Sequence, residues 1–143
     1  AWRVNNKTIA FSNGCFDILH EGHIFSLNQA ASEADILIIG VNSDLSVKRL
    51  KGPERPINNE ISRSIMLSNL AVVDAVVVFE EDTPLTLIQS LMPDVIVKGG
   101  DYTIDQIVGS KEVIANGGRV VINPIVEGFS TTGLIAQIKK SYS

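Results

Sequence analysis

Short apolar runs alternate with longer amphipathic segments along the chain, and this alternation limits the possible folds more than any other feature. Each run is rich in valine and isoleucine and too short for a buried helix, as expected of central strands in a parallel sheet. We expect strands over residues 8–12, 35–41, 75–79, 95–98 and 119–123, and helices over 22–34, 60–72, 84–91, 110–116 and 131–140. This order predicts a doubly wound α/β fold with five parallel strands and helices on both faces.

The length of 143 residues fits one domain, and no internal repeat or linker interrupts it. We therefore expect a single Rossmann-like domain over residues 1–143. No apolar run approaches the roughly 18 residues that cross a bilayer, and the net charge of −4 disfavours a nucleic-acid-binding protein. One cysteine excludes an internal disulfide and a multi-cysteine zinc site, and no signal peptide is visible. These features predict a cytoplasmic protein without membrane or nucleic-acid partners.

Ligands of such folds bind outside the carboxyl ends of the strands, so the loops there should carry the chemistry. The segment SNGCFDILHEGH, residues 12–23, follows the first predicted strand. Asn13 and Gly14 allow the tight turn and close backbone approach of a phosphate loop. His20 and His23, the only histidines, share one face of a helix start, where they could donate to phosphoryl oxygens. The alternative interpretation is a helix cap beside a surface side chain.

Cys15 has no base or metal partner that the sequence identifies, so we expect a small loop residue and not a nucleophile. No third His or Cys stands near the two histidines, which argues against zinc, and we assign no metal ligand.

A basic segment at residues 48–56, KRLKGPERP, holds four of the twelve basic residues, all of them within positions 48–55. Its glycine and prolines predict a shaped loop, and its charges suit a triphosphate or sugar phosphate. A solvated surface loop is the alternative.

Three further polar clusters follow predicted strands or precede the last helix. In KGGDY, residues 98–102, paired glycines let a ligand lie against the backbone, and Asp101 could accept from a sugar hydroxyl or help to hold a metal. In EGFSTT, residues 127–132, hydroxyl groups and helix N-terminal amides could bind an anion. Asn42, followed by Ser43 and Asp44, could bind a ligand or cap a helix. Plain turns and caps remain the alternatives for all three.

Two nucleotide-binding motifs are missing. No GxxxxGK[ST] string occurs, which excludes a P-loop, and the absence of GxGxxG weakens a dinucleotide-binding interpretation.

The HxGH signature at His20, Gly22 and His23, together with SerThrThr at 130–132, resembles the cytidylyltransferase-like nucleotidyltransferase superfamily. Within it, NGCFDILHEGH, NSDLSVKRLKG, ERP, FEEDTP, VKGGDY, GSKEV, ANGG and GFSTT are similar to the nucleotidyltransferase domain of bacterial ADP-heptose synthase. This resemblance extends from residue 11 to about residue 139.

The resemblance implies transfer of AMP from ATP, accompanied by Mg²⁺, to D-glycero-β-D-manno-heptose 1-phosphate, with release of pyrophosphate and formation of ADP-heptose for lipopolysaccharide. His20 and His23 would stabilise the transition state at the α- and β-phosphates, and Lys51 would engage phosphate, with Lys48 as its rival. Residues expected to contact the nucleotide are Asn13, Gly14, Cys15, Phe16, Gly22, Gly100, Asp101, Glu127, Gly128, Ser130, Thr131 and Thr132. Residues expected to contact the acceptor are Asp17, Asn42, Lys48, Arg55 and Lys98.

Two other functions remain open. A cytidylyltransferase acting on a small phosphorylated or phosphonate alcohol would use the same groups, but Ile125 stands where glycerol-3-phosphate cytidylyltransferases have an arginine. A regulatory module that binds nucleotide without turnover is the other. The resemblance also implies a homodimer and a sugar kinase, either fused to this domain or separate.

Overall fold

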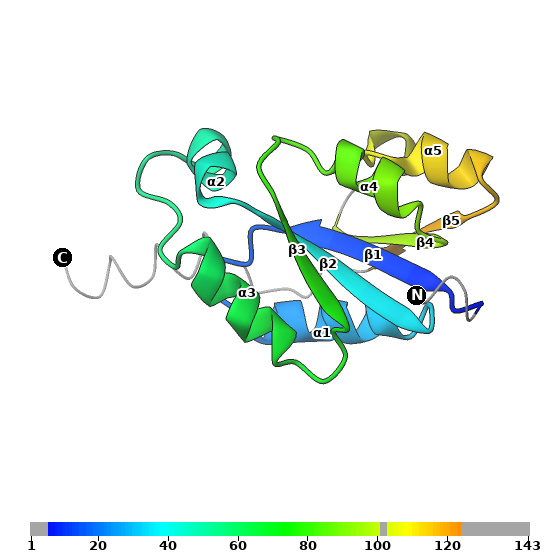
Figure 1. Cartoon of the computed structure of the whole chain (residues 1–143), viewed down its shortest axis with the longest axis horizontal. Coiled ribbons are helices and arrows are strands. Elements are labelled where there is room, and N and C mark those ends of the chain that lie inside the picture. Colours follow the sequence, from blue (N-terminus) through cyan, green and yellow to red (C-terminus); the bar gives the residue numbers. More distant parts are fainter. Residues whose placement is uncertain (1–5, 101–102, 124–143) are drawn as a thin grey trace.

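The protein is built around one parallel β-sheet. The computed structural model describes residues 6–100 and 103–123, in which five strands are all parallel to their neighbours (Figure 1). They are β1 (Ile9–Gly14), β2 (Ile36–Asn42), β3 (Ala75–Phe79), β4 (Val95–Gly99) and β5 (Arg119–Asn123). Their spatial order is β3-β2-β1-β4-β5, so the chain reverses its direction of winding between β1 and β4. Ligands of open α/β sheets bind at such a switch point.

Helices cover both faces of the sheet, which confirms the doubly wound fold. The described helices are α1 (Glu21–Ala31), α2 (Asp44–Lys51), α3 (Glu60–Ser68), α4 (Leu85–Leu91), α5 (Ser110–Ala115) and the 3-10 helix η1 (Ile104–Gln106). Figure 1 shows α1 and α3 on one face, with α4 and α5 on the other. No helix in residues 6–100 and 103–123 is both long and apolar enough to span a bilayer.

Alternating side chains of the strands form two hydrophobic cores. Ala10 of β1 faces one core and packs with Leu27 of α1. Its neighbour Phe11 faces the other core, with Ile88 of α4 and Val113 of α5. Because both faces are buried, the central strands need apolar residues at nearly every position, which explains the continuous Val and Ile runs.

The secondary structure departs from the prediction mainly at α2. Ser43 caps this helix, since its Oγ accepts from the N–H of Ser46 at 3.1 Å. The helix was not predicted because it presents no continuous apolar face: Val47 is buried, while Leu45 and Leu50 are exposed. The predicted helices over 22–34 and 60–72 each end three or four residues earlier in the structure, and the one over 131–140 lies outside the described residues.

Candidate active site

A cavity of about 620 Å³ opens where β1, β2 and β4 end. Segments far apart in sequence form its wall because parallel strands bring their carboxyl ends to one edge. The lining residues are Asn13, Gly14, Cys15, Phe16, Asp17, His23, Asn42, Leu50, Lys51, Arg55, Asp82, Thr83, Pro84, Lys98, Gln106, Ile107 and Val108. Most of the candidate residues predicted in the described part of the chain therefore share one cavity.

The two histidines form a reciprocal cap at the start of α1. His20 is the N-cap residue, and its Nδ1 accepts from the N–H of Gly22 at 3.1 Å. The Nδ1 of His23 accepts from the N–H of His20 at 3.2 Å, and the two rings stack with centroids 3.9 Å apart. Since each Nδ1 is an acceptor, the hydrogen of each neutral ring is assigned to Nε2. Capping and phosphate binding therefore use different nitrogens, so the two sequence interpretations are compatible.

The surroundings of both imidazoles favour their neutral forms. Burial, followed by the charge of His20, lowers the pKa of His23 to about 4. Burial also lowers the pKa of His20. A neutral ring protonated on Nε2 is a hydrogen-bond donor without charge, and a triphosphate beside it would favour uptake of a second proton.

The depressed His23 pKa predicts acid sensitivity of the fold. A group whose folded pKa lies below its unfolded value near 6.5 adds stability above that value, and the stability is lost as the pH falls toward 4. Because the His23 ring is only partly buried, we expect the free energy of unfolding to fall between pH 7 and 4.5 by about 1 kcal/mol more in the parent than in His23→Gln. Urea denaturation at both pH values measures this, and equal losses would contradict the assignment.

Phe16 connects the loop after β1 to His23. Its backbone is left-handed, with φ 49°, a strained conformation for a residue other than glycine. Its ring contacts that of His23 with centroids 5.4 Å apart. A Cβ on Gly14 would lie 3.0 Å from the Phe16 ring, so a larger residue there would require this ring to shift by a few tenths of an ångström. The strain is thus retained at the place where a ligand would contact the loop.

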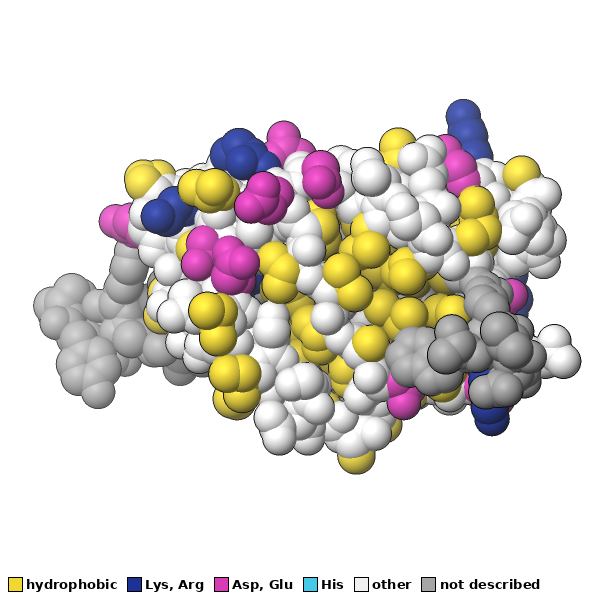
Figure 2. Space-filling model, in the orientation of Figure 1, with side chains coloured by type: hydrophobic (Ala, Val, Ile, Leu, Met, Phe, Trp, Pro, Cys, Tyr) yellow, Lys and Arg dark blue, Asp and Glu magenta, His cyan; other side chains and the backbone are white. Residues whose placement is uncertain are grey.

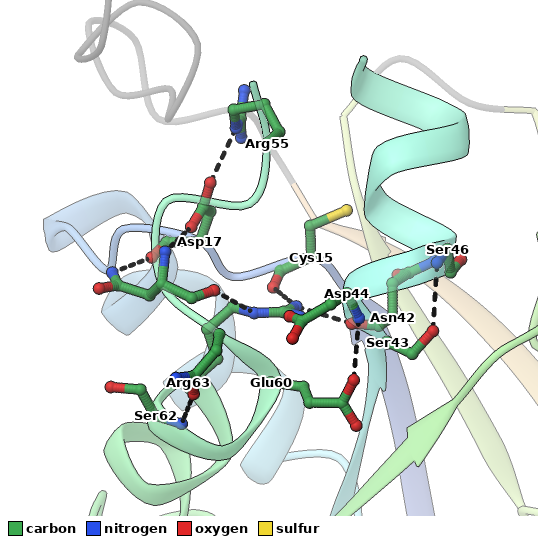
Figure 3. A network of polar contacts seen from close by, with 12 residues as sticks. Cys15, Asp17, Asn42, Ser43, Asp44, Ser46, Arg55, Glu60, Ser62 and Arg63 are labelled. Atoms are coloured by element: carbon green, nitrogen blue, oxygen red, sulfur yellow. Dashed lines mark hydrogen bonds and ion pairs between the residues drawn. The ribbon is translucent and has the colours of Figure 1, made fainter. Parts of the chain in front are cut away.

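Arg63 of α3 is a central residue of the site that sequence reasoning missed. Its side chain is 1% exposed, and Nη1 donates to the carbonyl oxygens of Cys15 and Asn42, both at 2.7 Å (Figure 3). Nε donates to the Asn58 carbonyl at 3.0 Å, and Nη2 donates to Asp44 Oδ1 at 2.9 Å. One guanidinium therefore joins the loops after β1 and β2 to the segment before α3. The sequence around Arg63 does not distinguish it from a surface arginine of an amphipathic helix, so this connecting role could not be predicted.

The segment after β2 serves mainly to cap and connect. Ser43 caps α2 and Asp44 pairs with Arg63, as the capping alternative predicted for this triplet. Asn42 lines the cavity, while its Nδ2 donates to Ser46 Oγ at 3.0 Å. An acceptor-binding role for Asn42 stays a prediction.

The first half of the basic segment is helical, whereas the half that contains the glycine and prolines is a loop, as predicted. Lys48, Arg49 and Lys51 lie in the last turn of α2, whose N-cap Ser43 starts the helix that the pattern did not predict. Lys51 lines the cavity, whereas Lys48 is exposed and outside the lining. Arg49 donates from Nε to Asp82 Oδ1 at 2.8 Å and also to the Glu80 carbonyl, which holds the loop after β3 against α2. Of the two lysines, only Lys51 is therefore placed to meet a ligand in this cavity, and its phosphate-binding role stays a prediction.

Cations surround Cys15 in the cavity wall. Burial raises the pKa of the Cys15 thiol, and Lys51, Arg63 and Arg55 offset this only in part. Burial lowers the pKa of Lys98 at the end of β4, and Lys51 adds to the effect. A thiol with a raised pKa supports the prediction that Cys15 is not a nucleophile.

Several predicted residues lie outside this cavity wall or outside the described structure. Gly22 is buried in α1, and Gly100, with φ 111°, donates its N–H to the Asn123 carbonyl at 3.2 Å. The predicted residues outside the described ranges are Asp101, Ile125, Glu127, Gly128, Ser130, Thr131 and Thr132.

The donor set of the described residues does not fit a resident metal centre. In residues 6–100 and 103–123, no three His, Cys, Asp or Glu side chains gather where they could hold a metal ion. The two cavity carboxylates already have cationic partners, since Asp17 pairs with Arg55 and Asp82 with Arg49. In other proteins Mg²⁺ binds together with substrate phosphates and needs only one or two protein carboxylates.

Comparisons with known proteins find a matching family and several relatives. The family model described as cytidylyltransferase-like matches residues 11–137. The chain is 55% identical over 139 residues to the bifunctional protein HldE of Mesorhizobium japonicum, and 57% identical over 136 residues to that of Hyphomonas neptunium. These matches cover 97% and 95% of the chain but 28% of either relative, so the chain spans under a third of their length.

Two solved structures have a similar fold. The lipopolysaccharide core biosynthesis protein from Thermoplasma volcanium is 32% identical with a TM-score of 0.68, and the match covers 84% of this chain and 97% of that one. Pantoate-beta-alanine ligase from Francisella tularensis has a TM-score of 0.57 at 15% identity, covering 83% of this chain and 59% of the ligase, which shows a shared fold.

Proposed function

The chain belongs to the cytidylyltransferase-like family, and from this we propose that it transfers AMP from ATP to a sugar 1-phosphate. The acceptor we propose is D-glycero-β-D-manno-heptose 1-phosphate, with ADP-heptose and pyrophosphate as products. The resemblance of KGGDY and GSKEV to bacterial ADP-heptose synthase supports this acceptor. The similarity to a lipopolysaccharide core biosynthesis protein also supports it.

The paired histidines are the observation that carries the proposal. His20 and His23 stack at the N-terminus of α1, and the backbone occupies both Nδ1 atoms, which leaves Nε2 as the proton-bearing nitrogen of each ring. His23 lines a cavity whose wall also holds Lys51 and Lys98. Hydrogen-bond donors at a helix N-terminus stabilise negative charge that develops on phosphoryl oxygens, and nearby cations add to this effect.

The reaction needs no nucleophilic side chain, because the acceptor brings its own nucleophile. A phosphate oxygen of the sugar 1-phosphate attacks the α-phosphorus of ATP in line. The new bond joins that oxygen to the α-phosphorus, and the bond to the bridging oxygen of the β-phosphate breaks, so that pyrophosphate leaves with the electron pair. The protein positions the two phosphates and stabilises the charge that moves to the leaving group.

A pyrophosphate-release assay tests this function directly. ATP, CTP, GTP and UTP are each combined with heptose 1-phosphate or with glycerol 3-phosphate, and kcat/KM is compared. We expect ATP with heptose 1-phosphate to exceed CTP with the same acceptor by roughly tenfold to two-hundredfold, because a purine-sized pocket loses burial and stacking with cytosine. A tenfold preference for CTP would reject adenylyl transfer. Nucleotide binding without turnover would indicate a regulatory module.

Lys51 and Lys48 make a matched pair for testing the phosphate contacts. Lys51→Ala is expected to weaken ATP or sugar-phosphate binding about tenfold, because it removes a cation from the cavity wall. Lys48→Ala removes the same charge one turn earlier, outside the lining, and should change either affinity less than twofold. Titration calorimetry at two salt concentrations measures the ligand affinities of both variants. Equal effects of the two substitutions would favour the alternative interpretation, a solvated surface segment.

We also propose a homodimer, a sugar-kinase partner and a cytoplasmic location. The 28% coverage of relatives called bifunctional supports a second activity outside this chain. Figure 2 shows apolar side chains gathered over and beside β3, and Ile61 and Ile65 of α3 are exposed. These apolar residues support self-association, which sedimentation velocity measures.

A further inference from the structure

We propose that Arg55, held in position by Asp17, binds the phosphate group of the acceptor. The inference rests on the proposed function for the identity of the acceptor. Arg55 lines the cavity, its side chain is 12% exposed, and its Nε donates to Asp17 Oδ2 at 2.8 Å. Among residues 6–100 and 103–123, nothing accepts a hydrogen bond from its two terminal nitrogens. A largely buried guanidinium with four unused N–H donors indicates an anionic ligand.

Asp17 has the opposite property, because protein donors already occupy its carboxylate. The side chain is fully buried, and its oxygens accept from Arg55 Nε, from the N–H of Ile57 at 2.9 Å and from the N–H of Asn58 at 2.8 Å. Burial alone would raise the pKa of Asp17, but these backbone N–H groups and Arg55 lower it below its usual value. The carboxylate therefore stays charged and acts through Arg55, where the sequence predicted direct contact with the acceptor.

The pairing fixes the direction of the guanidinium. Asp17 binds Nε of Arg55 (Figure 3). The backbone N–H groups of Ile57 and Asn58 donate to the same carboxylate and connect it to the backbone that follows Arg55. A guanidinium anchored through Nε presents its terminal N–H groups as a planar fork, which matches two oxygens of a phosphate. Lysine cannot reproduce this geometry, because its ammonium group lacks the fork.

A terminal phosphate occurs on both ATP and the acceptor, and the arrangement of elements favours the acceptor. The stacked histidines and the start of α1 supply donors for ATP. Arg55 comes from a different segment, between α2 and α3, so it can bind a second phosphate group without competing for the first. Two phosphates that react together repel each other, and separate cations offset that repulsion.

The first experiment separates the two phosphate sources. Titration calorimetry measures the Kd of a non-hydrolysable ATP analogue, and then the Kd of heptose 1-phosphate in its presence. Arg55→Gln should weaken heptose 1-phosphate binding roughly tenfold to a hundredfold and change the analogue's Kd less than threefold. Arg119→Gln, which removes a charge from the exposed pair with Glu33, should change neither. Unchanged acceptor affinity in Arg55→Gln, an equal loss for the analogue, or no acceptor binding by the parent would overturn the proposal.

The second experiment tests the positioning role of Asp17. Asp17→Asn should also weaken acceptor binding at least tenfold and leave the analogue's Kd unchanged, and the double variant should be no weaker than Arg55→Gln alone. Additive losses would overturn the coupling. Arg55→Lys provides a test that leaves the Asp17 carboxylate in place and keeps the positive charge. If this variant bound the acceptor nearly as well as the parent, the proposed two-point contact of the guanidinium with the phosphate would be overturned.

Failure of the proposed function would look different. A parent that binds heptose 1-phosphate through Arg55 but releases no pyrophosphate would reject the adenylyl transfer and retain this site. If the parent released pyrophosphate normally and Arg55→Gln bound heptose 1-phosphate as well as the parent, the adenylyl transfer would be retained and this site rejected.

Discussion

Replacing either histidine of the stacked pair while keeping its cap should abolish most of the turnover. We expect His20→Asn and His23→Gln to lower kcat by about two to three orders of magnitude, since each removes an Nε2–H donor to the phosphates. Asparagine is a favourable N-cap residue, and glutamine three residues later completes a capping box, so the helix start should persist. Pre-steady-state and steady-state pyrophosphate release measure kcat for both variants.

The alanine variants provide the control for the capping alternative. His20→Ala and His23→Ala lose both the cap and the donor, so they should lose about 1 kcal/mol of stability in addition to turnover. If the alanine variants were unstable while the asparagine and glutamine variants turned over within a few-fold of the parent, capping would be the sole role of these histidines. Urea denaturation of all four variants separates the two results.

Loss of Arg63 should have the largest effect on stability of any single substitution in the site. Arg63→Met would leave three carbonyl oxygens and the partly exposed carboxylate of Asp44 without their donor, so we expect the free energy of unfolding to fall by about 3 kcal/mol. The Cys15 loop would also lose its connection to Asn42, which should weaken nucleotide binding. Denaturant titration at pH 7 measures the stability loss.

Arg119→Met is the matched control for this prediction. Arg119 also donates to a carboxylate and a carbonyl, those of Glu33, but its side chain is 54% exposed. An exposed pair contributes little, so the expected loss is below 1 kcal/mol. If both variants lost similar stability, the buried connection through Arg63 would not hold the loops together.

The strands and the histidine pair could be predicted from the sequence because their signals are local. Each strand lies within one apolar run, since a residue buried on both faces of a sheet must be apolar wherever it stands. His20 and His23 are three residues apart at a helix start, which is the spacing at which an N-cap residue and the third helical residue cap each other. Their position after β1 then assigns them to the ligand edge of an open sheet. The family resemblance found in the same strings was confirmed by the match over residues 11–137.

Only the tertiary structure decided the contacts that join distant segments. Arg63 meets Cys15 across 48 residues, and Arg55 meets Asp17 across 38, and no periodicity links such pairs. Helix α2 forms although its apolar residues do not make one face, because Ser43 caps it and its Arg49 holds the loop after β3. Lys51 lines the cavity and Lys48 does not, because α2 ends at Lys51 beside the cavity. The density of charges in the sequence does not distinguish the two lysines. A charge has the same sequence signal whether it is solvated or buried, and its partner is known only once the chain has folded around it.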